Sequence, residues 1–421
     1  MGARRCSNNN ASNMVRESLP PDTPAAMRSP LRIIRKRPIA SPALRRIVLS
    51  RSTVFHDSEL TLLNLTASRG EYRGPMKRCL LLLTLPLVTF AAPRYTAART
   101  TDHGIEIIRL SDTQRGVEVA IAPAVGNRVY ELKVHGNNLL YFPAPDIAAY
   151  KNNPRPPLDG IPFLAPWANR ISGGGFWADG KRYIFNSDLG SVHVAPDGIA
   201  IHGMLSLSPL WEVTSVAADH NSAHVTSRLD FWKYPELMAN WPFAHEYEMT
   251  YTLRGGALEV STSVKNLSDE PMPVVIGFHP YFNIPGVPRA EWTAHVAARK
   301  HVQTDAKLVA TGEFTPNDLP GQISLRDHNF DDGFTDLVRG SDGRATFSVQ
   351  AGDKKIEVIY GPKYQVAVVY SPPGQNYICF EPMAAITNGI NLAREGKYPE
   401  LQSAAPGATW AENFWVQFSG F

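Results

Sequence analysis

The sequence predicts an all-β protein in which residues 96–421 form one large antiparallel β-sandwich. Apolar and polar residues alternate along many short runs, and this period of two is typical of strands with one buried face. Gly, Pro, Asn and Asp separate the runs at the short intervals expected between antiparallel strands. We see no long helical periodicity and no repeat of fixed length, so a single sandwich fits better than several small domains.

The expected strands follow one another through this region. They are residues 105–110, 117–121, 128–134, 258–264, 272–278, 347–350, 355–360 and 365–370. Turns are expected at residues 135–138, 179–180 and 254–256, where Gly, Asn and Asp gather.

Residues 1–75 differ in composition from the rest of the chain. They carry 13 Lys and Arg against 5 Asp and Glu, whereas the net charge of the whole chain is only +3. The remainder is therefore mildly acidic, and it shows no nucleic-acid footprint. An organelle transit peptide and a basic arm for nucleic acid are two interpretations of this leader. We favour a third, a disordered or wrongly assigned leader upstream of the true start.

Residues 76–92 have the layout of a secretory signal peptide. Lys77 and Arg78 provide a positive start, an apolar stretch runs to Phe90, and small residues follow. This stretch is too short to span a bilayer comfortably. We therefore expect translation to start at Met76 and the protein to be periplasmic or secreted, with no membrane contact beyond the export signal. A buried helix or strand is the alternative interpretation.

Cysteine and histidine usage indicates neither disulfides nor a metal. After removal of a signal peptide only Cys379 remains, inside an apolar run, so stability must come from a large core. His245-Glu-Tyr-Glu-Met249 lacks the second histidine of a zinc-binding helix, and no paired-cysteine motif occurs. We expect no metal and no cofactor.

The stretch Gly277-Phe-His-Pro-Tyr-Phe-Asn-Ile-Pro-Gly286 is the first candidate for chemistry. Pro280 cannot donate to a sheet ladder, so the strand before it should end near His279. An imidazole at a strand end, beside aromatic rings that can stack on a sugar, suits proton transfer on a carbohydrate. A hairpin end with a surface histidine is the plainer interpretation.

Two further segments offer polar groups in loops. Residues 160–174 contain Asn169 and Arg170, whose donors suit sugar hydroxyls, and Trp167, which could supply a stacking face. A short apolar run ends at His202, where the following glycine lets the backbone approach a ligand. Arg170 could equally be a clamp for loop carbonyls, and His202 an ordinary structural histidine.

Carboxylates complete the candidates. Asp331 and Asp332 lie in a Gly-containing turn, where one could accept hydrogen bonds from sugar hydroxyls and both could simply be solvated. Glu381 ends a strongly apolar run, and Pro382 forbids continuing the ladder. Apolar surroundings raise the proton affinity of a carboxylate, which favours a general acid or base near neutral pH. An exposed strand-end glutamate is the alternative.

Taken in order, these segments resemble the aldose 1-epimerase (galactose mutarotase) family. An Asn-Arg-Ile loop at residue 169 precedes a His-Gly, His-Pro-Tyr-Phe-Asn, an aspartate in a turn and Phe-Glu-Pro. The resemblance covers about residues 100–420, and it departs from the family at Met204, where a second glycine is usual. It implies a galactose mutarotase-like supersandwich of antiparallel sheets and a cofactor-free interconversion of the α and β anomers of free sugars.

The resemblance also implies a role for each residue. Glu381 would be the general base at the C1 hydroxyl, His279 the general acid at the ring oxygen, and His202 a third catalytic group near that oxygen. Arg170, Asn169 and either Asp331 or Asp332 would bind hydroxyls, and Asp331 fits the family spacing better. The expected partner is a small sugar, and the protein would be a monomer or a homodimer.

Three other functions stay open. Glu381 and Asp331 could form the carboxylate pair of a glycoside hydrolase. The same cleft could belong to a non-catalytic carbohydrate-binding protein. A sugar-phosphate epimerase would need several basic residues beside Arg170, and the loop offers none clearly.

Overall fold

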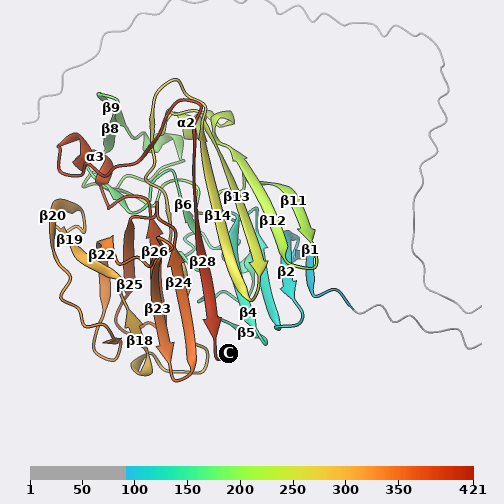
Figure 1. The fold of residues 1–421 in the computed structure, drawn as a ribbon. Coiled ribbons are helices and arrows are strands. Elements are labelled where there is room, and N and C mark those ends of the chain that lie inside the picture. Colours follow the sequence, from blue (N-terminus) through green and yellow to red (C-terminus); the bar gives the residue numbers. More distant parts are fainter. Residues whose placement is uncertain (1–91) are drawn as a thin grey trace, which may run out of the picture. The chain divides into compact units, whose positions relative to one another are not determined.

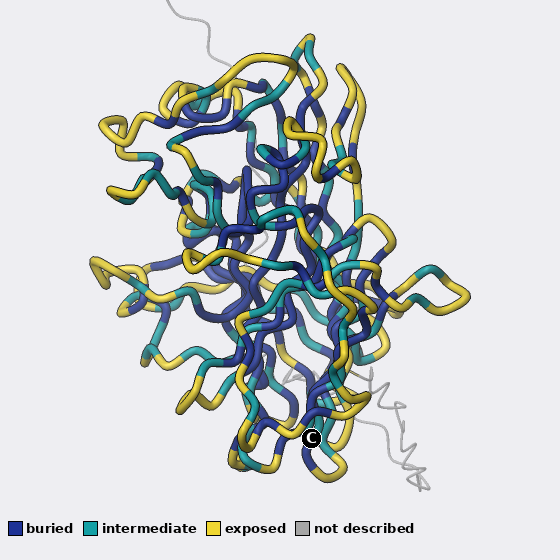
Figure 2. Tube along the Cα trace, turned by 90° about the vertical axis from the view of Figure 1, so that its left-hand side faces the viewer, coloured by how far each residue is buried: buried dark blue, intermediate teal, exposed yellow. Residues whose placement is uncertain are grey.

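The structure is a computed structural model that describes residues 92–421. The expected leader and export signal lie outside the described residues. Figure 1 shows the arrangement of the strands, and Figure 2 shows that buried segments run through the interior while exposed ones form the connecting loops. Among the described residues no helix is long and apolar enough to cross a membrane.

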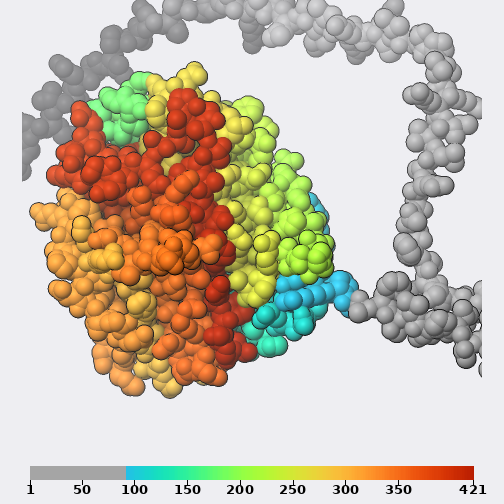
Figure 3. All heavy atoms as spheres, viewed as in Figure 1, coloured from blue at the N-terminus to red at the C-terminus, as the bar shows by residue number. Residues whose placement is uncertain are grey.

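The largest sheet has nine strands in the order β11-β12-β13-β14-β28-β24-β23-β18-β21. In Figures 1 and 3 this order can be followed from green β11 through yellow β14 and red β28 to orange β24 and β23. The strands are β11 (Glu212–Ala218), β12 (Ala223–Asp230), β13 (His245–Arg254), β14 (Ala257–Asn266), β18 (Thr293–His295), β21 (Ile323–Ser324), β23 (Ala345–Ala351), β24 (Lys354–Tyr360) and β28 (Thr409–Ser419).

The second sheet carries the candidate site and has eight strands, in the order β20-β19-β22-β25-β26-β16-β6, with β17 also paired to β26. All the pairings in it are antiparallel. The strands are β6 (Phe163–Leu164), β16 (Gly277–Phe278), β17 (Tyr281–Phe282), β19 (Ala298–Thr304), β20 (Ala310–Pro316), β22 (Phe330–Leu337), β25 (Val366–Ser371) and β26 (Ile378–Met383).

A third sheet has five strands in the order β1-β2-β3-β4-β5. Its strands are β1 (Tyr95–Asp102), β2 (Ile105–Asp112), β3 (Val117–Ala122), β4 (Arg128–Val134) and β5 (Asn137–Asn138). β1 and β2 contact β11 and β12, so this sheet packs against one end of the nine-stranded sheet.

Three short pairs and a few helical turns complete the fold. The pairs are β7 (Arg170–Ile171) with β10 (Ala200–Ile201), β8 (Gly175–Ala178) with β9 (Lys181–Ile184), and β15 (Met272–Pro273) with β27 (Ser403–Ala404). The α-helices are α1 (Ile147–Asn152), α2 (Pro235–Met238) and α3 (Gly389–Arg394), and the 3-10 turns are Ser187–Leu189, Phe231–Lys233 and Arg289–Glu291.

The main core lies between the eight-stranded and nine-stranded sheets. The ring of Phe380 on β26 lies 6.1 Å from that of Phe347 on β23, and Phe278 on β16 lies 4.9 Å from Phe414 on β28. Because side chains alternate along a strand, Glu381 points away from this core, to the other face of β26. One face of the eight-stranded sheet therefore packs in the core, and the opposite face carries Glu381.

The all-β antiparallel prediction is confirmed, and most expected strands match observed ones closely. The run 272–278 is the exception, because it is not one strand. Met272 and Pro273 pair with β27, whereas Gly277 and Phe278 pair with β6 and β26. The chain crosses between two sheets here, with the amide of Val274 bound to the carbonyl of Gln402 in between. The strand does end before His279, as Pro280 predicts.

Candidate active site

Glu381 lies in the middle of β26, a strand whose six residues are all buried. The prediction that Pro382 ends this strand is wrong, because β26 continues to Met383 and Pro382 lies opposite Ala367 of β25. The side chain of Glu381 is 1% exposed, and neither carboxylate oxygen has a hydrogen-bond partner among the described residues. Buried polar atoms are nearly always paired in folded proteins, because an unpaired one costs free energy. The two free oxygens therefore indicate a position that a ligand completes.

His279 lies beside Glu381 although it comes from a distant segment. Nε2 of His279 is 3.2 Å from Oε1 of Glu381, in an orientation that does not make a direct hydrogen bond, and Nδ1 of His279 has no described partner. The main chain fixes the position, since the amide of His279 donates to the carbonyl of Pro162. The imidazole is also stacked on Tyr281, with the rings 4.6 Å apart and 7° from parallel.

Burial disfavours the charged form of both Glu381 and His279. It raises the pKa of Glu381 well above its ordinary value, and nearby Asp331 raises that pKa further while Arg170 opposes it. It lowers the pKa of His279 well below its ordinary value, and His202 adds to this effect. Two such neighbours share a single proton, because neither the doubly protonated nor the fully deprotonated pair is favourable in a buried site.

His202 lies in a loop, and its ring is next to that of His279. The ring lies edge-on to that of His279, with the centroids 5.7 Å apart, and its Nδ1 has no described partner. Burial lowers the pKa of His202 to about 4, so the imidazole is neutral at neutral pH. The loop holds His202 at a φ of 63°, and its amide donates to the carbonyl of Asn169. A neutral imidazole here can donate one hydrogen bond and accept another.

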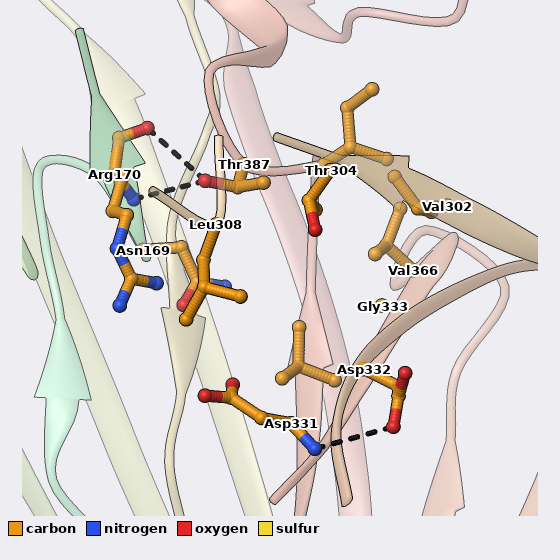
Figure 4. A pocket seen from close by; sticks show the side chains of 12 residues that line it. Asn169, Arg170, Val302, Thr304, Leu308, Asp331, Asp332, Gly333, Val366 and Thr387 are labelled. Atoms are coloured by element: carbon orange, nitrogen blue, oxygen red, sulfur yellow. Dashed lines mark hydrogen bonds between the residues drawn. The ribbon is translucent and has the colours of Figure 1, made fainter. Parts of the chain in front are cut away.

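Asn169 and Arg170 are held between that loop and the segment after β26. The carbonyl of Arg170 accepts from the amide of Asn388 at 2.7 Å, and its amide donates to Oγ1 of Thr387. Figure 4 shows the guanidinium of Arg170 pointing away from these main-chain bonds and into a pocket. Nδ2 of Asn169 is buried and has no described partner. Both side chains are therefore placed to donate to a ligand.

Asp331 and Asp332 lie on the strand β22 and not in the turn that the sequence predicted. Their side chains point in different directions, because successive residues of a strand face opposite sides. In Figure 4 the carboxylate of Asp331 is directed towards Arg170, whereas that of Asp332 turns the other way. Asp332 lies 2.8 Å from Nε2 of His301 and accepts from the amide of Asp331. Partial desolvation raises the pKa of Asp331, against the opposing effect of Arg170. The geometry thus favours Asp331 as the carboxylate that faces a ligand.

A pocket that is open to solvent lies beside these groups. It is lined by Asn169, Arg170, Val302, Thr304, Leu308, Asp331, Asp332, Gly333, Val366, Val368, Ile386 and Thr387. Glu381 and His279 are not in this lining. They lie next to it, because Val368 pairs directly with Glu381 across β25 and β26. The pocket therefore lies beside the pair formed by Glu381 and His279.

The sequence did not reveal the roles of two of these residues, and it suggested a wrong role for a third. Trp167 is fully buried and stacked on Phe185 and Trp241, so it is a core residue and cannot stack on a ligand. Tyr281 and Thr387 were missed as supports of His279 and Arg170. Cys379 is buried, as expected. Within residues 92–421 no cluster of three or more His, Cys, Asp or Glu could hold a metal ion.

Residues 106–417 match the aldose 1-epimerase family. Solved structures share the fold. A galactose mutarotase-like protein from Clostridium acetobutylicum is 24% identical, with a TM-score of 0.69 over 78% of this chain and 99% of the other. A galactose 1-epimerase from Lactobacillus acidophilus is 14% identical, with a TM-score of 0.61 over 78% and 100%. An aldose epimerase homologue from C. elegans is 16% identical, with a TM-score of 0.56 over 77% and 99%.

Proposed function

Because the chain belongs to the aldose 1-epimerase family, we propose that it interconverts the α and β anomers of a free aldose by opening and reclosing the pyranose ring. The observation that carries this proposal is the buried pair of Glu381 and His279, whose oxygens and Nδ1 have no described partner. An acid and a base in contact are what this reaction requires.

The proposed reaction uses the one proton that the pair shares. Burial favours the form of the pair with this proton on Glu381. Ring opening therefore requires that the proton first move to His279, which leaves a carboxylate at the C1 hydroxyl of the bound sugar and an imidazolium at its ring oxygen. Glu381 takes the hydroxyl proton while His279 gives its proton to the ring oxygen, the C1–O5 bond breaks and the C1 carbonyl forms. The pair still holds one proton, now on Glu381. Rotation about C1–C2 and the reverse transfers give the other anomer.

The 3.2 Å separation of the pair supports this assignment. The two oxygens that exchange protons are bonded to the same anomeric carbon, so the acid and the base must lie close together. A glycoside hydrolase instead places two carboxyl groups about 5–9.5 Å apart on opposite sides of a bond. Here the neighbour of Glu381 is an imidazole, which favours anomer interconversion over bond hydrolysis.

The remaining polar groups would hold the sugar in this orientation. His202 would donate to or accept from oxygens near the ring, since its imidazole lies beside His279. Arg170, Asn169 and Asp331 would bind ring hydroxyls from the pocket side. Positioning of this kind makes the proton transfers effectively intramolecular.

Polarimetry of freshly dissolved α-D-glucose and α-D-galactose tests the proposal. The protein should speed relaxation to an unchanged final rotation, and Glu381→Gln and His279→Asn should each slow the enzymatic rate by about 100-fold or more. Glu357→Gln, on the far β24, is the matched control and should leave the rate unchanged. Binding without acceleration, in a folded sample, would instead favour the carbohydrate-binding alternative, and release of reducing ends from an oligosaccharide would favour a hydrolase.

A further inference from the structure

We propose that Leu308 contacts the substrate directly, by packing against the apolar C–H face of the sugar ring whose hydroxyls Arg170 and Asp331 bind. This inference rests on the proposed function and adds a binding residue to it. It is carried by a strained backbone conformation that the fold keeps at a residue in the lining of the pocket.

Leu308 is the last residue of the turn between β19 and β20. Its amide donates to the carbonyl of Asp305, and the amide of Asp305 donates to the carbonyl of Val309. The side chain of Asp305 closes the turn from within, since its Oδ1 accepts from the amides of Lys307 and Val309. The loop therefore has three residues, and hairpins of this length usually have glycine at the last one, because it adopts the left-handed conformation.

Leucine is an unusual residue for such a position. Leu308 has a φ of 59°, which brings its Cβ close to the following carbonyl oxygen. Within residues 92–421 nine non-glycine residues have a positive φ, and the other eight are all Asn, Asp or His, which tolerate it better. Two of those eight are Asn169 and His202 of the candidate site. Backbone strain of this kind is retained mainly at functional sites, so Leu308 needs a functional reason.

The turn that holds Leu308 lies close to Arg170. Main-chain hydrogen bonds lower the pKa of Asp305 in this turn, and the positive charge of Arg170 contributes to the effect. Nζ of Lys307 is 3.3 Å from Oδ2 of Asp197, in the loop that leads to β10, and β20 packs against α3. An exposed ion pair adds little stability, but it shows that the tip of the hairpin meets a second loop of the site.

The side chain of Leu308 lies among the groups proposed to bind hydroxyls. Figure 4 shows it beside Asn169 and the guanidinium of Arg170, on the side that faces the carboxylate of Asp331. All four residues line the same pocket. Leu308 is only partly buried, so part of its apolar surface is free to contact a ligand. A sugar whose hydroxyls reach Arg170 and Asp331 therefore has its ring next to Leu308.

The two kinds of surface on a pyranose explain why an aliphatic group is useful here. The hydroxyls project mainly around the rim of the ring, where charged and amide groups can bind them. The faces of the ring carry C–H bonds, and their burial against an apolar side chain is favourable. The sequence offered Trp167 for this contact, but Trp167 lies in the core. Leu308 supplies an apolar surface that Trp167 cannot.

Removing the side chain should have opposite effects on stability and on substrate binding. Leu308→Asn suits the positive φ, so the melting temperature should stay the same or rise by up to about 4 °C. KM for D-glucose or D-galactose should nevertheless rise about five- to tenfold, as the loss of a partly buried leucine contact predicts. The value of kcat should change less than about twofold, because the contact is made before and during the reaction. Initial rates from polarimetry measure both constants.

Three further variants connect the effect to the apolar contact. Leu308→Gly removes the side chain without adding a polar group, and it should raise KM to the same extent as Leu308→Asn. Leu308→Met keeps an apolar side chain, so KM should stay within about twofold of the wild-type value. Leu267→Asn is the matched control, since Leu267 is 40% exposed and follows β14 outside the pocket, and it should leave KM unchanged.

Two outcomes would overturn the inference. The first is an unchanged KM in both Leu308→Asn and Leu308→Gly. The second is a rise in KM together with a fall in melting temperature of more than about 4 °C in both variants, which would assign Leu308 to the stability of the fold.

Failure of the proposed function gives a separate result. If the wild type accelerates neither sugar, calorimetric dissociation constants for D-glucose and D-galactose decide whether Leu308 contacts a bound sugar. Weaker binding to Leu308→Gly than to the wild type would support the contact. Equal binding to both proteins, or no binding to the wild type, would overturn it.

Discussion

Asp331 and Asp332 are neighbours in the sequence, yet they lie on opposite faces of β22. The carboxylate of Asp331 is directed towards Arg170 at the pocket, whereas Asp332 lies 2.8 Å from His301 on the other side. Two chemically identical groups, one residue apart, therefore have different surroundings.

This difference predicts unequal effects of the same substitution. Asp331→Asn should lower kcat/KM by about 10- to 100-fold, mainly through KM, because a hydrogen bond to a charged group is worth about 1.5–3 kcal/mol. Asp332→Asn should change kcat/KM by less than about threefold. Steady-state polarimetry of both variants measures this, and a larger loss for Asp332→Asn would reverse the assignment.

Tyr281 should orient His279 through the stacked rings, which are 4.6 Å apart. Tyr281→Leu removes the stacking partner, so we expect kcat to fall about tenfold while KM changes little. Tyr281→Phe keeps the ring and should keep most of the activity. If Phe and Leu have the same effect, the hydroxyl or the packing volume matters and the orientation does not.

Gly203 should be intolerant of any side chain. It has a φ of 66°, and a Cβ there would lie 2.2 Å from the carbonyl oxygen of Ala165, so the backbone would have to move. We expect Gly203→Ala to lower the free energy of unfolding by about 2–3 kcal/mol and to displace His202.

Gly180→Ala is the control for this effect. Gly180 also has a positive φ, of 75°, but nothing lies within 4 Å of the position of its Cβ. Gly180→Ala should therefore lower the free energy of unfolding by only about 1 kcal/mol, through backbone strain alone. Urea unfolding measures both variants, and equal costs would show that the contact with Ala165 relaxes without penalty.

His245 should make the fold sensitive to acid. Its side chain is buried and stacked on Phe231, and burial lowers its pKa to about 4 from an ordinary value of 6.5. Between these values the unfolded chain binds a proton that the folded protein does not, so stability falls as the pH falls from 6.5 to 4. The titration of His245 alone should lower the free energy of unfolding by about 3 kcal/mol as the pH falls over that range.

The matched measurement compares the wild type with His245→Phe. Phenylalanine can occupy the same aromatic cluster without titrating. Other buried groups act in the opposite sense, including Asp159, whose pKa burial raises to about 6, so the difference between the two proteins is the informative quantity. Parallel urea unfolding curves for the two proteins at pH 4.5 and 7 that show no such difference would contradict the assignment of His245.

The sequence predicted the strands best where apolar and polar residues alternate strictly, as in β4 and β24. It predicted the end of β16 because Pro280 cannot continue a ladder. It could not decide between Asp331 and Asp332, because which of two adjacent side chains faces a cleft depends on strand register. Leu308 could not be foreseen, since its backbone conformation contradicts the preference of leucine.

The main-chain bonds around Arg170 have a consequence for how the site responds to a substrate. The carbonyl of Asn169 accepts from His202, the carbonyl of Arg170 accepts from Asn388, and Thr387 holds the amide of Arg170. Three distant segments are thereby joined into one rigid body. The groups proposed to bind the sugar are therefore ordered before it binds, so binding should cost little conformational entropy. A mutation that loosens any one of the three segments should weaken the hydrogen bonds that all three make to the sugar.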